Sequence, residues 1–593
     1  MAVSWAHVLT WETGPLDSIA SDLLEASKGL REAYESGDTV VWSVRSKGEA
    51  VTTMQATTIC NLASLDSALT NVNGALMAIE AARDGVGSIM ADINEAKAFA
   101  ALHGCTINSN GGVTAIEEGK RYITPLANNV RAILEKANQV DTDLAQALAS
   151  INTDRYTDGD RGSNKVVGIP DVPQPNWSPS QNAAWWNSLP EDRKKYLIDH
   201  CPDDIRHLDG LPAAARDQAN RNALEGYVDA NGKKHQGALK DAEQALEQAQ
   251  LAYDIADKKQ ANNKADGYVA AAKADAQIEL ERAKAAYEDL KAIREQTAND
   301  VRASKGLAPA YLLDFNYDKD YHRTTAIVSS GNPDTATHVS TLVPGIGTNV
   351  RGDLAKYVAA NDRLRAQTAH AGVDPNNVAT ISYLGYVAPK NDGFNNIQAA
   401  DIGYANRAAP VLARFEEGLR ANAEANHHKF TNTLVTHSYG STTGGKAAAL
   451  MAPGTIDRLI LTGSPGGGVD SIDEYNVPRE HVYESSIPEG DAVQGIGPDA
   501  YYGKNPRHLE GITHLSGDAT DAKDYWHLLP EDVGHHARFG NALAHAIANH
   551  MLYFEDGTRT SQDFANIIAG GNPTTDEEWA AIKAARAKEN NGH

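Results

Sequence analysis

From about residue 309 onwards, short β-rich runs alternate with helical stretches, and this alternation restricts the fold more than any other feature. The runs are apolar and rich in β-branched or aromatic residues, as buried strands are. They occupy residues 311–315, 324–328, 339–343, 379–386, 432–437, 458–462, 481–485 and 512–515. Helical stretches at 354–371, 400–425, 445–451 and 539–553 separate the later runs. This order predicts an α/β domain over residues 306–570, with a mostly parallel sheet covered by helices.

The chain before residue 306 is predicted to be helical. Residues 1–153 show helical periodicity and predict an N-terminal bundle, whereas residues 154–182 are rich in Asp, Gly, Asn, Pro and Ser and predict a linker. Residues 183–305 form a second helical region. Its apolar residues alternate spacings of three and four, as in coiled coils: Leu239, Ala242, Leu246, Ala249, Tyr253 and Ala256, then Ala276, Leu280, Ala283, Tyr287 and Leu290. A break between the two sets predicts an antiparallel helical hairpin. Residues 571–593 are a charged, alanine-rich tail.

Composition excludes several classes of partner. The formal net charge is −24, which argues against binding to nucleic acid or to an anionic membrane surface, because both require a basic face. No run of about 18 apolar residues could span a bilayer, so we do not expect a transmembrane protein. The three cysteines, Cys60, Cys105 and Cys201, have no metal-ligand spacing. We therefore expect neither a metal nor a cofactor.

The sharpest local signal is the segment LVTHSYG at residues 434–440. An apolar strand leads into Ser438, and small residues and a helix follow, which is the setting of the G-x-S-x-G nucleophile elbow of α/β-hydrolases. Gly440 fits this motif, whereas Thr436 replaces its first glycine. The segment predicts that Ser438 is the nucleophile of a serine hydrolase.

Two nucleotide-binding motifs are incomplete in the same region. The segment GSTTGGKA at 440–447 resembles a phosphate-binding loop, but Ala447 stands where Ser or Thr would hold Mg²⁺. The segment Gly345-Ile346-Gly347 lacks the third glycine of a dinucleotide fingerprint, because Val350 takes its place. The first match is therefore rejected, and the second segment favours an ordinary turn.

In an α/β-hydrolase the acid and then the histidine follow the serine along the chain. Asp491, in a Gly-Asp loop after the 481–485 run, is the predicted acid, and Glu489 is the alternative. His535, directly after Gly534, is the predicted base that takes the Ser438 proton, while the acid fixes its tautomer. Other histidines remain open as the base: His536, His527 and His514.

The oxyanion hole requires two backbone N–H groups where negative charge develops. Tyr439, the residue after the predicted nucleophile, supplies one. The loop after the 339–343 run supplies the other, and Ile346 is the predicted donor, with Gly345 or Gly347 as alternatives.

Several segments together resemble an actinobacterial α/β-hydrolase family described as a domain of unknown function, DUF1023. They are YLLDF at 311–315, GNPDTA at 331–336, LVPGIGT at 342–348, ATISYLGY at 379–386 and HSYGS at 437–441, with the helical stretch 208–220 before them. The resemblance covers roughly residues 175–560. It implies an α/β-hydrolase fold and a Ser–Asp–His triad, and it implies no particular substrate.

The N-terminal half carries a second resemblance. Two long helical stretches around a tryptophan-bearing turn at Trp42 resemble the small helical-hairpin proteins of type VII secretion, although Trp42-Ser43-Val44 lacks their glycine. No basic segment followed by an apolar run is visible near Met1, so we expect no Sec-type signal peptide. The compartment stays open between the cytoplasm and export by a type VII-like route.

The leading functional hypothesis is a serine hydrolase, an esterase or lipase-like enzyme that acts on a small-molecule or lipid ester through an acyl-enzyme. Two alternatives remain. One is a non-catalytic secreted or cell-envelope protein that binds a protein partner through its helical half, and the other is a peptidase or amidase with the same triad. The sequence leaves the oligomeric state open.

Overall fold

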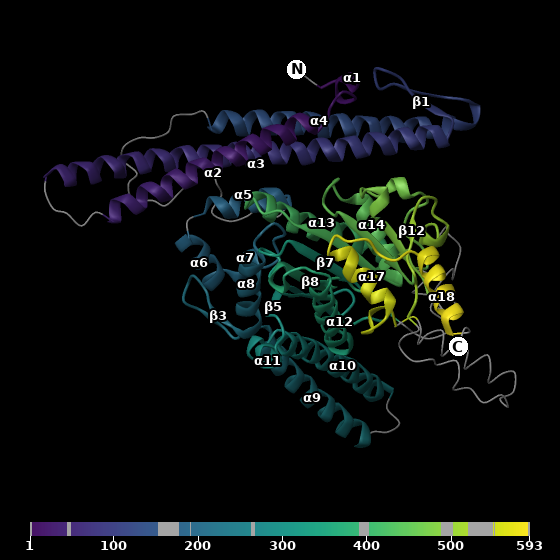
Figure 1. Cartoon of the computed structure of the whole chain (residues 1–593). Coiled ribbons are helices and arrows are strands. Elements are labelled where there is room, and N and C mark those ends of the chain that lie inside the picture. The colour runs from purple at the N-terminus through teal and green to yellow at the C-terminus, as the bar shows by residue number, and fades with distance from the viewer. Residues whose placement is uncertain are drawn as a thin grey trace. The chain divides into compact units, whose positions relative to one another are not determined.

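The computed structural model describes residues 3–43, 49–151, 177–189, 191–262, 267–390, 402–487, 502–519, 550 and 552–590. The chain divides into two compact units, Met1–Lys194 and Lys195–His593. Figure 1 shows the long helices of the first unit and the sheet of the second. Among the described residues, no helix combines the length and the apolar character needed to cross a membrane.

The first unit is built on long helices. Its elements are α1 (Trp5–Val8), α2 (Gly14–Ser43), α3 (Glu49–Leu102), β1 (Cys105–Ile107), β2 (Val113–Ala115), η1 (Glu117–Tyr122), α4 (Ile123–Ile151) and α5 (Pro179–Ser188). Ile89 of α3 and Ile133 of α4 are buried in a common core with Trp5. The predicted helical character is confirmed except at β1 and β2, which form a short antiparallel hairpin within the predicted bundle.

Trp42 lies in the last turn of α2, which ends at Ser43, and α3 begins at Glu49. The connection between these two helices, where the turn is expected, lies outside the described residues. Cys105 and Cys201 are both free thiols; Cys105 is buried and Cys201 is half-buried.

The second unit contains an eight-stranded sheet in the order β12-β11-β10-β9-β7-β8-β6-β5. The strands are β5 (Ala310–Asp318), β6 (Arg323–Ser330), β7 (His338–Val343), β8 (Val378–Leu384), β9 (Thr431–His437), β10 (Arg458–Thr462), β11 (Val482–Ser485) and β12 (Thr513–His514). Only β6 runs against its neighbours β5 and β8, and the other pairs are parallel. All eight predicted runs are strands, and the predicted α/β class is confirmed.

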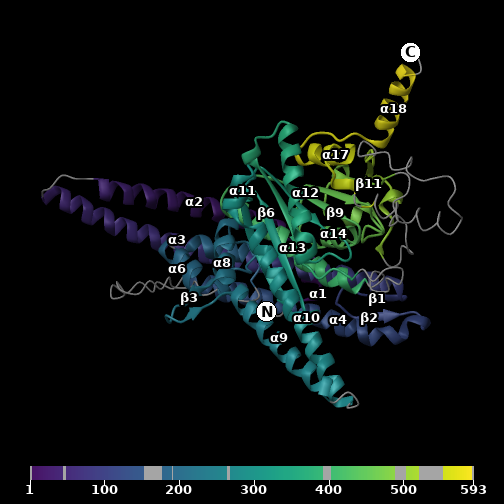
Figure 2. The same ribbon diagram turned by 90° about the horizontal axis from the view of Figure 1, so that it is seen from below.

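Helices cover both faces of this sheet, as Figures 1 and 2 show. On one face lie α13 (Gly403–Ala425) and α14 (Tyr439–Leu450), and on the other lie α12 (Val350–His370) and α17 (Arg559–Ile568). The central strand β9 is buried on both sides, because successive side chains of a strand point to opposite faces. Leu434 belongs to the core under α13 and α14, and Val435 belongs to the core under α12 and α17.

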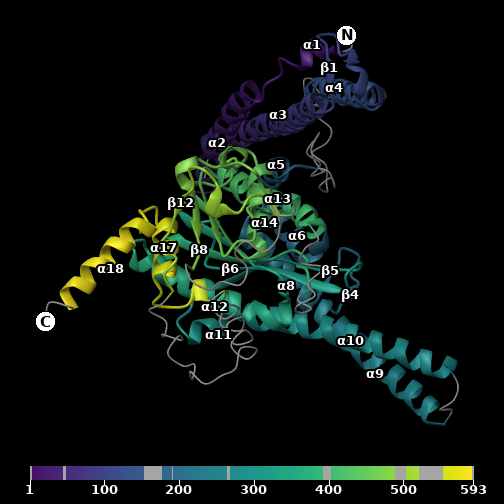
Figure 3. The same cartoon turned by 90° about the vertical axis from the view of Figure 1, so that its right-hand side faces the viewer.

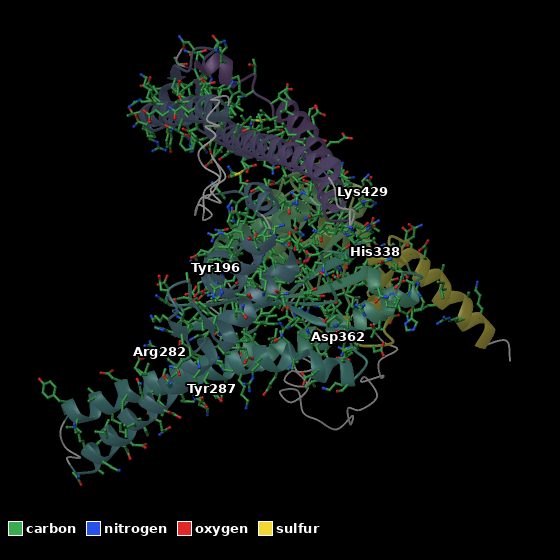
Figure 4. The ribbon with its side chains drawn as sticks, turned by 90° about the vertical axis from the view of Figure 1, so that its left-hand side faces the viewer. Tyr196, Arg282, Tyr287, His338, Asp362 and Lys429 are labelled. Carbon is green, nitrogen blue, oxygen red and sulfur yellow. The ribbon has the colours of Figure 1, made fainter. Side chains whose placement is uncertain are left out.

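Most of the helical region before the sheet is part of the second unit, which begins at Lys195 within α6 (Glu191–His200). The region continues with α7 (Pro202–Ile205), α8 (Ala213–Glu225), the antiparallel hairpin of α9 (Ala238–Asn262) and α10 (Gly267–Gln296), and α11 (Asn299–Ser304). Lys273 of α10 pairs with Asp257 of α9 at 2.7 Å. The two helices project beyond the sheet (Figure 3), as the heptad spacing predicts. The buried Arg302 of α11 pairs at 2.7 Å with Asp362 of α12, which Figure 4 labels.

Helix α8 covers the exposed edge of β5 with polar side chains. The Asp217 carboxylate accepts the Leu312 N–H at 2.6 Å, and the Arg216 guanidinium donates to the Leu313 carbonyl at 2.9 Å. Asn220 donates to the carbonyls of Leu312 and Leu313. An edge strand exposes unpaired backbone groups that can pair with another chain. These side chains pair those groups and attach α8 to the sheet.

The last helix, α18 (Asp576–Asn590), occupies most of the predicted tail. A single antiparallel bridge joins Thr575 to Leu515, directly after β12. Trp579 of α18 is buried, and its indole N–H donates to Asp518. The tail therefore contacts the opposite edge of the sheet.

We expect Asp217→Ala to lower the free energy of unfolding by about 2 kcal/mol or more, because it leaves the buried Leu312 N–H without an acceptor and Arg221 without its carboxylate. Urea unfolding measures this change. Asp275→Ala, on the exposed face of α10, is the control and should change little. Equal values for the two variants would show that the β5 edge does not depend on Asp217.

A buried carboxyl group makes the stability depend on pH. Glu416 of α13 is fully buried and accepts a hydrogen bond from Asn432 of β9 at 2.8 Å. Burial raises the pKa of Glu416 to about 7, against the opposing effect of that hydrogen bond. Glu416 is therefore protonated in the folded protein at a pH where the unfolded chain has lost the proton.

We expect the free energy of unfolding to fall as pH rises from about 4.5 to about 7, by on the order of 3 kcal/mol from this group. The sign follows because the folded state binds more protons than the unfolded state across this range. Glu416→Gln, which cannot ionise, should lose this contribution. Urea unfolding of both proteins between pH 5 and 8 tests this, and parallel curves would contradict it.

Candidate functional site

Ser438 lies on the turn between β9 and α14 with φ 59° and ψ −134°. Among the described residues that are not glycine, only His322 and His427 share a positive φ with Ser438. The ψ of Ser438 places it outside the left-handed helical region, in a part of the map that is almost restricted to glycine. Such a conformation costs on the order of 1–3 kcal/mol and tends to occur at functional sites. Ser438 thus has the strained strand–turn–helix geometry that the sequence predicts.

Two glycines make room for this turn. A Cβ on Gly345, in the loop after β7, would lie 2.5 Å from the Ser438 Cβ and 2.8 Å from its Oγ. A Cβ on Gly440 would lie 2.5 Å from the carbonyl oxygens of Val343 and Pro344. The loop after β7 therefore passes directly beside the serine hydroxyl, and only glycine fits at either position.

Thr436, which replaces the first glycine of the motif, is accommodated by a third glycine. A Cβ on Gly444, inside α14, would lie 2.4 Å from the Thr436 Cγ2. The Thr436 hydroxyl donates to the Ile460 carbonyl at 2.8 Å and contacts the Ser441 hydroxyl at 3.2 Å. In the usual motif a glycine on the strand leaves this space, whereas here the glycine on the helix, Gly444, leaves it. Gly440 to Lys446 all lie within α14, so this glycine-rich segment does not form a phosphate-binding loop.

The predicted oxyanion residues lie on either side of Ser438. Tyr439 is the first residue of α14, and Ile346 follows Gly345. The Ile346 N–H makes no hydrogen bond within the described part of the chain, whereas the Gly347 N–H already donates to the Pro389 carbonyl at 2.7 Å. Of the residues considered, Gly347 is therefore the least suited to the role.

Three contacts hold the loop that carries Ile346. The Tyr386 hydroxyl donates to the Pro344 carbonyl at 2.5 Å, and the Thr348 hydroxyl donates to the Gly345 carbonyl at 2.9 Å. The Gly347 bond to Pro389 is the third. A backbone donor in this loop has a fixed direction, as oxyanion stabilisation requires.

The predicted acid and most of the candidate histidines lie outside the described residues: Asp491, Glu489, His527, His535 and His536. Their roles remain predictions. His514 is described and belongs to β12, three strands from β9. With neighbouring strands about 4.8 Å apart, its backbone is about 14 Å from that of Ser438. The structure does not bring His514 to the serine.

His514 instead pairs with a buried carboxylate that the sequence analysis missed. Its Nδ1 lies 2.9 Å from the Glu484 Oε2, and Ser486 donates to the other carboxylate oxygen. The hydrogen bond to Glu484 raises the pKa of His514. Nothing local marks Glu484, because it lies in a strand and its partner follows thirty positions later.

A small apolar cluster surrounds the residues that flank the serine. Tyr439, Tyr502 and Ala405 are buried in it, and Ile346, Ile402 and Tyr404 pack against them. The Ala405 N–H donates to the Tyr439 hydroxyl at 3.1 Å, and the rings of Tyr439 and Tyr502 meet edge to face. Both predicted oxyanion residues thus carry side chains in one aromatic and aliphatic cluster.

Comparison with known proteins agrees with this geometry. Residues 320–499 match the model of a family described as alpha/beta hydrolase. The second unit carries an α/β-hydrolase domain. This match and the eight-stranded sheet support a hydrolase.

Two relatives of the chain come from one mycobacterial species. Two uncharacterized proteins of Mycobacterium tuberculosis, MT2140 and Rv2079, are each 27% identical over 447 residues. The alignment covers 72% of this chain and 62% of each relative, so it spans less than two thirds of their length. No solved structure matches the chain significantly.

We expect Gly444→Ala to destabilise the protein by about 1–2 kcal/mol, because its methyl group overlaps the Thr436 Cγ2. Thr436→Ser keeps the hydroxyl and removes that methyl group. The double variant should therefore recover most of the loss, with a coupling energy of about 1 kcal/mol or more in a double-mutant cycle. Additive effects in urea unfolding would show that Gly444 does not accommodate Thr436.

Proposed function

We propose that the α/β-hydrolase domain is a serine esterase in which Ser438 is the nucleophile. The backbone conformation of Ser438 carries this proposal, together with the loop after β7, which can approach the serine only because Gly345 has no side chain. A residue with a side chain holds such a conformation only where its surroundings enforce it. The same turn positions a hydroxyl group above the sheet in the nucleophile elbow.

The proposed reaction uses the predicted triad and the two predicted oxyanion donors. A histidine, for which we propose His535, accepts the Ser438 proton as the hydroxyl attacks the ester carbonyl, while Asp491 holds that imidazole in the required tautomer. The N–H groups of Ile346 and Tyr439 stabilise the negative charge on the carbonyl oxygen. The histidine then protonates the leaving alcohol, and water releases the acid from the acyl-enzyme by the same steps.

The surroundings of Ser438 favour an apolar acyl group. Ser438 itself is only 4% exposed, and the cluster that includes Tyr439, Tyr502 and Ile346 lies beside it. A site with aromatic and aliphatic walls and few polar groups binds apolar chains. We therefore propose carboxylic esters with an apolar acyl chain as the substrate class.

A fluorophosphonate probe should label the native protein and should not label Ser438→Ala. On an ester that the native protein cleaves, Ser438→Ala should lower kcat on the order of 10⁴-fold or more. Ser464→Ala is a matched control, because Ser464 is also buried and follows the end of the neighbouring strand β10. This control should keep its labelling and activity.

The other outcomes separate the alternatives. Absence of labelling in the folded native protein would contradict the esterase and favour a binding protein that acts through its helical half. Faster cleavage of aryl amides than of matched p-nitrophenyl esters would favour a peptidase or amidase. Loss of labelling in His536→Ala but not in His535→Ala would transfer the role of base to His536.

A further inference from the structure

The residue directly before Ser438 makes contacts of its own. His437 is the last residue of β9 and is buried, with 3% of its surface exposed. Its Nε2 lies 2.8 Å from the His550 carbonyl oxygen, so the Nε2–H donates to that oxygen. The two imidazole rings stack with their centroids 4.5 Å apart. A residue 113 positions along the chain is thus bound to the neighbour of the candidate nucleophile.

The segment that contains His550 also packs against His437 through aromatic rings. Tyr553 and Phe554 meet the His437 ring edge to face, with centroids 5.9 Å and 5.6 Å away. Phe554 packs on Phe564 of α17, and the Phe554 carbonyl accepts a hydrogen bond from Arg363 of α12 at 3.2 Å. The segment is therefore fixed to the helices on this face of the sheet and to β9.

Tyr553 reaches a third part of the chain. It is completely buried, and its hydroxyl oxygen accepts the Ile487 N–H at 3.0 Å. Ile487 follows the end of β11 by two residues. The ring of Tyr553 thus touches His437 at the end of β9, and its hydroxyl group binds the chain just after β11.

These contacts have a simple relation to the proposed triad. His437 precedes Ser438 by one residue, Ile487 precedes Asp491 by four, and His550 follows His535 by fifteen. The side chains of His437 and Tyr553 therefore connect three described points of the chain, His437, Ile487 and His550, which lie near the proposed nucleophile, acid and base in the sequence.

We propose that His437 and Tyr553 are positioning residues that hold these three segments in register for the reaction. This inference rests on the proposed function. It follows physically because small misplacements of reacting groups, on the order of 1 Å, can lower a rate about 100-fold while binding is little changed. The hydrogen bonds to the His550 carbonyl and from the Ile487 N–H fix distances between segments that are far apart in sequence.

The test separates positioning from stability. His437→Phe keeps the ring stacking and removes the donor to His550, whereas His437→Gln can keep a donor near the Nε2 position. Tyr553→Phe removes only the hydroxyl group that binds Ile487. We expect kcat to fall about 10–100-fold in His437→Phe and Tyr553→Phe, with KM within about threefold of the native value and a partial recovery of kcat in His437→Gln.

Tyr475→Phe is the matched control. Tyr475 is also a buried tyrosine, and its hydroxyl group donates to the Gly467 carbonyl at 2.7 Å on the opposite face of the sheet. Its loss should lower the unfolding temperature about as much as Tyr553→Phe does and leave kcat within about twofold. Equal kcat losses in Tyr475→Phe and Tyr553→Phe, or an unchanged kcat in both His437→Phe and Tyr553→Phe, would overturn the inference.

The fluorophosphonate probe keeps the two proposals apart. If the native protein is not labelled, the esterase proposal fails and with it the role of His437. If the native protein is labelled through Ser438, and His437→Phe and Tyr553→Phe are labelled at the native rate, only the positioning role fails. We expect slower labelling in both variants, in proportion to their loss of kcat.

Discussion

The backbone of Ser438 adopts a conformation that excludes nearly every residue with a side chain, and the centre of the second unit is arranged around it. The strand that leads into it, β9, is paired on both sides, with β7 and with β10. Gly345 and Gly440 allow the loop after β7 and the start of α14 to approach within contact distance. A strained turn at the edge of the sheet would relax, whereas a turn between two paired strands has no room to do so. The central position of β9 therefore stabilises the strain.

That central position requires a sheet whose own edges are closed. At one edge, α8 pairs the backbone of β5 through Asp217, Arg216 and Asn220, and at the other edge the segment around Thr575 bridges to Leu515 after β12. Both covering segments are remote in sequence from the strand that they cover. The sheet therefore depends on the whole second unit, from residue 195 to the last helix, because α8, which precedes the first strand, completes the hydrogen bonding of β5. The hairpin of α9 and α10 leaves from this covering layer and packs back on α12 through Asp289 and Arg351, at 2.8 Å.

The sequence predicted what local patterns determine. All eight strands were found because a sheet covered by helices buries most of its side chains, so its strands are rich in apolar and β-branched residues, and Ser438 was found because strand, turn and helix are contiguous at the elbow. Contacts between distant segments were not found. Asp217, Arg216 and Asn220 have the composition of a solvated helix face, and only the sheet edge gives them a different role. Glu484 and His514 are separated by thirty residues, and β1 and β2 are each three residues long, too short for a periodicity.

The segment around Ser438 shows why a motif can be matched by volume when it is not matched by residue identity. The first glycine of G-x-S-x-G keeps space between strand and helix, and here Thr436 fills that space while Gly444 supplies it from the facing helix. The same alternation of side chains directs the residues around the serine to different partners. Thr436 points to α14, and His437 points to the opposite face, where it meets His550 and Tyr553. Because two such buried residues directly precede Ser438, each constrains the end of the strand that leads into the serine. The effect of a substitution at Thr436 or His437 should therefore depend on the space and the hydrogen bonds on the face of the sheet to which that side chain points, which the sequence motif does not specify.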